Sequence, residues 1–379
     1  MSADISCCQF KQKVSHTKRG FSLADKKKNT YKSEMEKELK RKLNEELKAM
    51  PDFVREYMVA KSVSKSPSTL YAYFIDMRVF LSFIKERDHL QMSLADMGLD
   101  ILGRVKPRDI LEYRDYLSNT NSLVGIKRKF SSLSAVYTYF CKTGALSSNP
   151  VRAVDMPKIS QKRVEVLKDN EIVRIFDAIE TGSSLSESAK KRFHESTKYR
   201  DMAIIALLLS SGIRLSELVG LNIRDIDFDH PDKDSSGNII YEAYVSRKGG
   251  NEDRIYLTEE TVGYIQRYME TNRKEMLKGK TDEDVPALFL SIRGSRLSKG
   301  SVEALIKKHA LAAVPTKNVH PHMFRKTRGT QIYNETNDLK LTAAILGDKS
   351  VEVVSTHYIA GNEQNRKDAA NIGKLRKEG

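Results

Sequence analysis

The sequence predicts a mainly helical protein that has a helical N-terminal domain and a C-terminal α+β domain with one small β-sheet. Three observations support this fold class. Apolar residues recur at three-and-four spacing in most segments, which is typical of amphipathic helices. Alternating apolar and polar residues are concentrated in one short region around a Gly-Gly-Asn turn. A charged stretch that follows two prolines separates the two halves.

Composition favours a polyanionic partner. The 379 residues carry 65 Lys and Arg against 50 Asp and Glu, a formal charge of +15 and a sequence pI near 9.4.

No apolar run approaches the ~18 residues that span a bilayer, and the N-terminus lacks a signal-peptide core. We therefore expect a cytoplasmic protein without a membrane partner. Three cysteines without zinc-ligand spacing fit a reducing compartment: Cys7, Cys8 and Cys141.

The first 50 residues are interpreted as a basic arm followed by a helix. Residues up to Thr30 are polar and basic with no sustained period, so they form either an arm that contacts a polyanion or a solvated tail. From Tyr31 to Met50 the charges alternate in sign, while an apolar residue recurs at every fourth position. This predicts an exposed helix whose narrow stripe packs against the next domain: Met35, Leu39, Leu43 and Leu47.

Residues 51–157 are predicted to form a compact helical domain. A helix after Pro67, capped by Ser68, has a core-facing apolar stripe. Two more helices are expected from Pro107 to Leu117 and from Val124 to Lys142. Some cations lie outside the stripes and are candidates for phosphate contacts, with a solvated face as the alternative for each: Arg114, Lys127, Arg128 and Lys129.

A linker is predicted at residues 158–168, because Asn149-Pro150 and Met156-Pro157 interrupt helices just before it. Such a tether would let two domains close around a ligand as a clamp. The linker is also basic, and its candidate phosphate contacts are Lys158, Lys162 and Arg163.

Residues 169–379 are predicted to form the second domain and a C-terminal tail. After a helix from Asp169 to Ile179, a polar loop from Thr181 to Thr197 is expected to be exposed and without a catalytic role. The apolar segment from Met202 to Leu209 predicts a buried central helix that ends at Gly212. A hairpin is expected with strands at 241–245 and 255–257, followed by helices at 259–274, 302–312 and 339–346.

A cationic motif opens another predicted helix. Pro321 suits a first helical turn, and His322 and Arg325 at i and i+3 then share one face. A helix N-terminus carries partial positive charge and unpaired N–H groups. This turn therefore has the properties of a phosphate-binding site.

Separated motifs in the C-terminal half occur in the order of one family. Residues 211–218 are SGIRLSEL, 246–251 are SRKGGN, 322–325 are HMFR, and 346–348 are LGD, followed by His357 and Tyr358. In these motifs the chain resembles the tyrosine recombinases, or phage and conjugative-element integrases. The resemblance implies a SAM-like core-binding domain that clamps one face of a DNA duplex, joined to a catalytic domain.

The resemblance also implies a site-specific recombinase that needs no metal or other cofactor. Tyr358 would be the nucleophile that forms a 3′-phosphotyrosyl bond, and Lys248 the general acid for the departing 5′-oxygen. Arg214 and Arg325 would stabilise the transition state, because their planar forks match nonbridging phosphate oxygens. His322 would donate a hydrogen bond or act as the base for the tyrosine.

Each of these residues alone also has a structural explanation. An arginine beside a buried helix commonly pairs with a carboxylate, here Glu217, and a hairpin lysine is commonly solvated. The joint occurrence of the motifs in order favours the catalytic interpretation. Glu217 is then expected to orient Arg214.

Asp348 departs from the family pattern, which usually has histidine or tryptophan after Leu-Gly. An ionised carboxylate repels a phosphate and cannot donate a hydrogen bond to it. We expect Gly347 to end the preceding helix and Asp348 to cap the next one. Lys326, where many relatives have histidine, keeps a positive charge.

The resemblance implies double-stranded DNA as partner, a homotetramer acting through a Holliday junction, integration and excision of a mobile element, and a directionality factor. The polar segment from Gly361 to Gly379 either docks on a neighbouring subunit or is a frayed tail. Two other functions remain open: a type IB topoisomerase that nicks and reseals one duplex, and a DNA-binding factor that has lost its chemistry.

Overall fold

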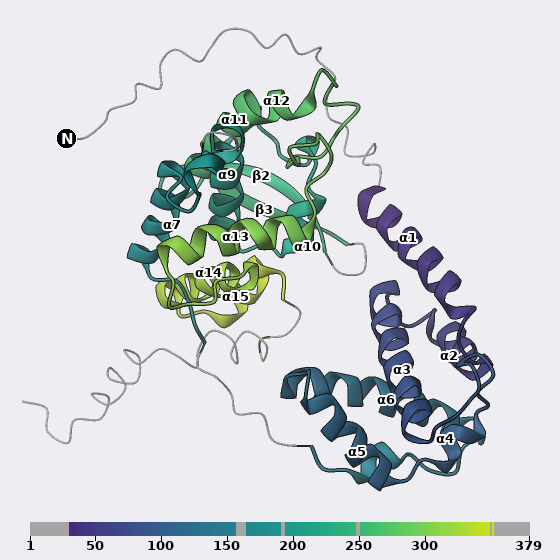
Figure 1. Cartoon of the computed structure of the whole chain (residues 1–379). Helices are drawn as coiled ribbons and strands as arrows, with labels where there is room; N and C mark the ends of the chain where they lie inside the picture. Colours follow the sequence, from purple (N-terminus) through teal and green to yellow (C-terminus); the bar gives the residue numbers. More distant parts are fainter. Residues whose placement is uncertain (1–29, 157–163, 191–193, 248–250, 349–350, 352–379) are drawn as a thin grey trace, which may run out of the picture.

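The structure is a computed structural model that describes residues 30–156, 164–190, 194–247, 251–348 and 351. Figure 1 shows two bodies, each with its own hydrophobic core. One core extends along the chain from Leu43 to Val154, the other from Leu167 to Phe324. Helices dominate both and the second body adds a small sheet, so the predicted fold class is confirmed.

The N-terminal body is built from helices, in chain order α1 (Thr30–Leu47), α2 (Asp52–Lys61), α3 (Pro67–Arg87), α4 (Asp100–Arg104), α5 (Pro107–Ser118), α6 (Leu123–Lys142) and the 3-10 turn η2 (Pro150–Ala153). The predicted cap of α3 is wrong by two residues. Ser66 caps the helix by accepting a hydrogen bond from the Thr69 amide at 3.3 Å. Pro67 is the first helical residue, a position where proline needs no N–H partner.

Helix α1 contacts both bodies. Leu43 and Leu47 near its C-terminus are buried in the N-terminal core, as the apolar stripe predicts, whereas Met35 of the same stripe is 47% exposed. At its N-terminal end, the ammonium of Lys32 donates a hydrogen bond to the carbonyl of Arg247 at 2.8 Å. The guanidinium of Arg296 lies over the ring of Tyr31, 4.4 Å from its centroid. The helix therefore links the N-terminal body to the sheet region of the second body (Figure 1).

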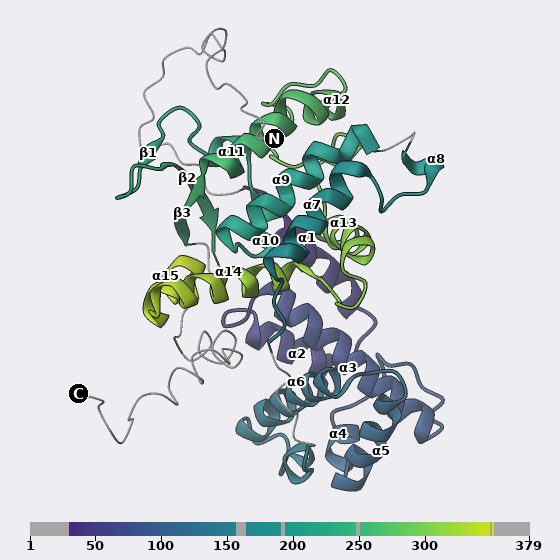
Figure 2. The same cartoon turned by 90° about the vertical axis from the view of Figure 1, so that its left-hand side faces the viewer.

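The C-terminal body has α7 (Asp169–Thr181), α8 (Glu187–Ala189), α9 (Glu195–Ser211), α10 (Leu215–Gly220), η4 (Ile223–Asp225), β1 (Asp232–Lys233), β2 (Ile239–Ser246), β3 (Glu252–Thr258), α11 (Glu259–Tyr268), the π-helical turn η5 (Met269–Arg273), α12 (Lys274–Leu277), α13 (Lys299–Ala313), α14 (Pro321–Thr336) and α15 (Leu339–Leu346). The strands are antiparallel in the order β1-β2-β3. Figure 2 shows α14 and α15 next to each other below β2 and β3.

Helix α9 is the centre of this body, as its apolar sequence predicts. It packs against α7, α11 and α14 and ends at Gly212. The helix predicted at 259–274 is interrupted by η5, where Arg273 is buried and donates hydrogen bonds to the carbonyls of Leu288 and Ala287. These partners lie outside the helix, so its local sequence does not reveal the interruption. Within the described ranges, no helix has both the length and the apolar character of a bilayer span.

Candidate active site

Two helix ends meet at the site. Helices α9 and α15 both end in a left-handed glycine, Gly212 at φ +62° and Gly347 at φ +65°. The ends are so close that a Cβ at Gly212 would lie 2.7 Å from Cδ2 of Leu346. The segments that leave these glycines therefore bring Arg214 and Asp348 together, although 134 positions separate them in sequence.

Arg325 on α14 binds both helix ends. Its Nη1 donates a hydrogen bond to the carbonyl of Gly212 at 2.9 Å, and its Nη2 donates one to the carbonyl of Leu346 at 2.8 Å. A cation is favourable at these ends, where helix carbonyls lack partners and carry partial negative charge. The residue is 2% exposed. Arg325 thus holds the ends of α9 and α15 in place.

Asp348 lies against both predicted catalytic arginines. Its Oδ1 accepts a hydrogen bond from Nη2 of Arg214 at 2.6 Å and lies 2.8 Å from Nη2 of Arg325. Its amide donates to the carbonyl of Ala343, and that of Gly347 to the carbonyl of Ala344, which closes α15 in a Schellman arrangement. The predicted end of α15 at Gly347 is confirmed. The predicted cap of a following helix involves residues outside the described ranges.

Glu217 on α10 connects two arginines. Its Oε1 accepts from Nη1 of Arg214 at 2.9 Å, and its Oε2 accepts from the backbone amide of Arg214 and from Nη1 of Arg247, both at 2.9 Å. The carboxylate side chain is 2% exposed. These contacts fix both the backbone and the guanidinium of Arg214, the arrangement expected for Glu217 from the sequence.

Arg247 is a site residue to which the sequence analysis assigned no role. It directly follows β2, its Nε donates to Oδ2 of Asp253 at 3.0 Å, and its guanidinium packs on Gly347. A signal was present in the alternation of β2, because Ala243 and Val245 are buried and the same parity turns Arg247 inward. Three arginines and three carboxylates thus form one network: Arg214, Arg247, Arg325, Glu217, Asp253 and Asp348.

Other predicted site residues lie in different surroundings. His322 is exposed on the first turn of α14, which begins at Pro321 as predicted, whereas Arg325 one turn later is buried. Lys248 and Tyr358 lie outside the described residues, as do Lys158, Lys162 and Arg163. Lys248 directly follows Arg247 in the chain.

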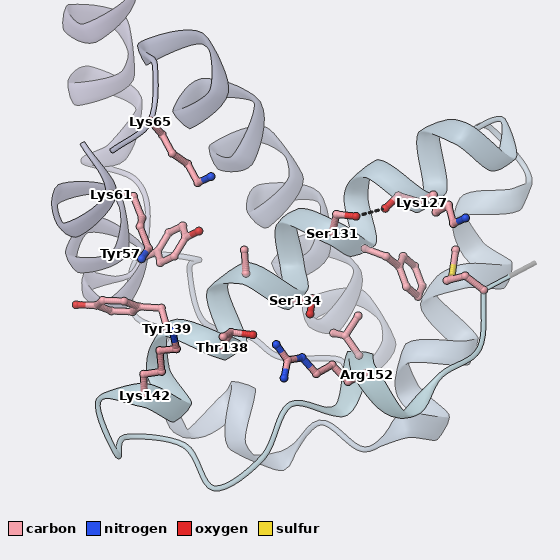
Figure 3. Close-up of a pocket in the computed structure, with 14 residues that line it drawn as sticks. Tyr57, Lys61, Lys65, Lys127, Ser131, Ser134, Thr138, Tyr139, Lys142 and Arg152 are labelled. Atoms are coloured by element: carbon pink, nitrogen blue, oxygen red, sulfur yellow. Dashed lines mark hydrogen bonds between the residues drawn. The ribbon is translucent and has the colours of Figure 1, made fainter. Parts of the chain in front are cut away.

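A basic hollow of about 620 Å³ opens on the N-terminal body (Figure 3). Its walls come from α2, α6 and η2, and the side chains of Lys65 and Arg152 point into it. The residues that line it include five cations, several hydroxyl groups and no carboxylate: Tyr57, Lys61, Lys65, Lys127, Phe130, Ser131, Ser134, Ala135, Thr138, Tyr139, Lys142, Val151, Arg152 and Met156. Cations beside hydroxyl donors suit a nucleic-acid backbone.

The phosphate contacts predicted on α5 and α6 divide into two groups. Lys127 lines the hollow. The guanidinium of Arg128 instead donates two hydrogen bonds of 2.6 Å to the carboxylate of Asp76. The ammonium of Lys129 lies 3.2 Å from the same carboxylate. Asp76 is 2% exposed, so the two cations compensate a buried negative charge. Arg114 pairs with Asp115 at 3.2 Å.

The comparisons with known proteins agree with this architecture. A model of the phage integrase family matches residues 165–365. The tyrosine recombinase XerC of Caldanaerobacter subterraneus subsp. tengcongensis is 30% identical over 342 residues, covering 87% of each chain. The tyrosine recombinase XerS of Streptococcus agalactiae is 31% identical over 363 residues, covering 86% of this chain and 97% of its own.

Solved structures share the fold. XerH site-specific recombinase in a post-cleavage complex with palindromic difH substrate superposes with a TM-score of 0.59 at 17% identity, covering 81% of this chain and 80% of its own. A lambda integrase dimer bound to a COC′ core site gives 0.57 at 18% identity, covering 82% and 77%.

The family match and these relatives place the chain among the enzymes that break and rejoin DNA. The chain belongs to the phage integrase family, the tyrosine recombinases, as its motifs indicate. It is a site-specific recombinase of the tyrosine type.

Proposed function

We propose that this recombinase exchanges strands between two DNA duplexes through a 3′-phosphotyrosyl intermediate on Tyr358 and a Holliday junction. The observation that carries the proposal is the convergence of Arg214 and Arg325 on one negatively charged oxygen, at 2.6 and 2.8 Å. Two guanidinium groups at that spacing suit the nonbridging oxygens of one phosphodiester. Catalysis of phosphoryl transfer depends mainly on such positioning and charge neutralisation.

The proposed reaction conserves the energy of the phosphodiester. The phenolic oxygen of Tyr358 attacks phosphorus and gives its proton to His322 acting as base, or to water where His322 acts only as a hydrogen-bond donor. The bond to the 5′-oxygen breaks, and Lys248 transfers a proton to that oxygen. The free 5′-hydroxyl of a partner strand then attacks the phosphotyrosine and gives its proton to Lys248, and Tyr358 leaves and regains its own proton. Strand exchange therefore needs no external energy source.

The basic hollow supports DNA binding by the N-terminal body. We propose that its cations, together with the linker cations Lys158, Lys162 and Arg163, contact the phosphate backbone on one side of the duplex while the arginine network faces the scissile phosphate. Arg114, Arg128 and Lys129 contribute less, because carboxylates already engage them.

We propose a tetramer as the active assembly, because two duplexes present four cleavage sites. A lambda integrase tetramer bound to a Holliday junction has the same fold, with a TM-score of 0.56 at 17% identity. Integration and excision of a mobile element, with a directionality factor, is the proposed biological role, and the match to the phage integrase family supports it.

The test is covalent trapping. The protein is incubated with a library of nicked duplexes that contain a randomised segment, and DNA that remains attached after denaturation is sequenced to identify the site. We expect an adduct that persists in EDTA and disappears in Tyr358→Phe, while Tyr256→Phe, a change at an exposed tyrosine of β3, retains it. Loss of the adduct in EDTA, or its retention in Tyr358→Phe, would contradict the proposal.

The role of Lys248 has a separate test. Replacing the 5′-oxygen at the cleavage site by sulfur gives a leaving group that needs no proton. We expect this substrate to restore cleavage by Lys248→Ala but not by Tyr358→Phe. Relaxation of supercoiled DNA without strand exchange between two identified sites would instead favour the type IB topoisomerase, and the absence of any adduct would favour the DNA-binding factor.

A further inference from the structure

The anion site between Arg214 and Arg325 is filled by a side chain of the protein itself. One carboxylate oxygen of Asp348 lies 2.6 Å from Nη2 of Arg214 and 2.8 Å from Nη2 of Arg325, and the side chain is 12% exposed. We propose that Asp348 competes with the DNA phosphate for the two arginines and holds the site inactive until a phosphate displaces it. This inference rests on the proposed function, because it concerns the same site.

Asp348 engages the Nη2 nitrogens of both arginines. Nη2 of Arg214 has two N–H groups, and it donates to the carbonyl of Gly347 at 3.1 Å and to Asp348. Nη2 of Arg325 donates a hydrogen bond to the carbonyl of Leu346 and forms an ion pair with Asp348 at 2.8 Å. A phosphate oxygen can lie between these two nitrogens only by taking the place of the carboxylate oxygen.

Electrostatic repulsion makes the two occupants exclusive. A carboxylate and a phosphodiester are both anions, and like charges at contact distance inside a largely buried network repel strongly. Glu217 already occupies Nη1 of Arg214. The phosphate therefore replaces Asp348 rather than binding beside it.

Displacement needs a rotation of one side chain and not the unfolding of a helix. The backbone of Asp348 is fixed because its amide donates to the carbonyl of Ala343 at 2.9 Å in the cap of α15. Rotation about the side-chain bonds turns the carboxylate away while this cap stays intact. The Arg325 contacts to Gly212 and Leu346 also remain.

The competition makes activity depend on DNA binding elsewhere on the protein. Free phosphate groups in solution meet an occupied site, whereas a duplex held by the basic hollow presents its phosphate at a high effective concentration. Asp348 would thus keep free nucleotides and unbound DNA ends out of the anion site, while the phosphate of a bound duplex displaces it.

Single-turnover cleavage of the trapped DNA site tests the proposal. Asp348→Asn keeps the shape without the charge, and Asp348→Ala removes the group. Both should cleave about tenfold faster than the wild type at subsaturating DNA, equivalent to about 1.4 kcal/mol. Glu335→Gln is the matched control, since it removes one negative charge at an exposed position of α14 and should cleave at the wild-type rate.

A second measurement needs no DNA. Inorganic phosphate should raise the melting temperature of Asp348→Ala more than that of the wild type or Glu335→Gln, because ligand that binds only the folded state stabilises it. Equal shifts in all three proteins would overturn the proposal. So would cleavage by both Asp348 variants at or below the wild-type rate, which would leave the proposed function intact. Absence of an adduct in every protein would overturn the proposed function, and the phosphate shifts would still decide whether Asp348 blocks the anion site.

Discussion

Gly347 packs directly on the guanidinium of Arg247, so closely that a Cβ atom on the glycine would lie 2.4 Å from Cζ of the arginine. The glycine also adopts a left-handed φ of +65°. Gly347→Ala should therefore destabilise the protein for two reasons. An alanine in the left-handed conformation costs about 1–2 kcal/mol, and the displacement of the Arg247 guanidinium by the new methyl group costs about 1–3 kcal/mol more. Urea unfolding measures the sum, and covalent trapping should show reduced cleavage because Arg247 holds Glu217.

Gly237→Ala is the control for this prediction. Gly237 also has a left-handed φ, +84°, but a Cβ there would meet no atom within 4 Å. It should lose only the backbone contribution, about 1–2 kcal/mol, and cleave normally. Equal losses in the two variants would show that contact with Arg247 is unimportant.

Glu217→Gln tests the carboxylate that connects Arg214 and Arg247. Each arginine would lose one of its two carboxylate partners, since Arg214 keeps Asp348 and Arg247 keeps Asp253. Removing one member of a buried pair destabilises proteins by about 3–5 kcal/mol when the remaining charge is left unpaired, so we expect a loss below about 3 kcal/mol here. Cleavage should fall with it, because the guanidinium of Arg214 is no longer fixed. Glu187→Gln removes a surface ion pair with Lys190, where the carboxylate is 82% exposed, and should leave stability and cleavage unchanged.

The network shows which parts of the site can be predicted from sequence. Local signals at Gly212, Pro321 and Gly347 correctly place the helix ends, because caps depend on a few neighbouring residues. The contact of Arg214 with Asp348 joins residues 134 positions apart, and no local pattern encodes it. The contact between Arg128 and Asp76 likewise spans 52 positions, which is why Arg128 looked available for DNA.

The basic hollow makes a prediction about salt dependence. In Lys65→Ala/Arg152→Ala, two cations that point into the hollow are lost (Figure 3). If each neutralises one phosphate, DNA affinity should fall and the slope of log K against log salt should decrease by about 2, since each contact contributes about 0.9. Arg104→Ala, an 80% exposed cation of α4 outside the hollow, should leave the slope unchanged.

Stability should also depend on pH through His309. Its Nε2 lies 3.0 Å from Oδ2 of Asp201, and its Nδ1 lies 2.8 Å from Oγ of Ser184. His309 on α13 is thus hydrogen-bonded both to Asp201 on α9 and to Ser184 in the polar loop after α7. Burial lowers the pKa of His309 below its ordinary value of 6.5 despite the carboxylate, with Lys308 and Arg200 adding to the decrease. The folded protein therefore favours the neutral imidazole.

A histidine with a lowered pKa contributes full stability above pH 6.5 and loses it as the pH falls towards its folded-state pKa, because the unfolded chain binds the proton more tightly. The free energy of unfolding, measured with urea between pH 7.5 and 5, should thus decrease more steeply for the wild type than for His309→Gln, which keeps a donor for Asp201 but cannot titrate. His230→Gln, at a 78% exposed position, should retain the wild-type slope. Parallel curves for the wild type and His309→Gln would mean that the imidazole titrates alike in the folded and unfolded chains, and the buried link between Ser184 and Asp201 would then contribute packing alone.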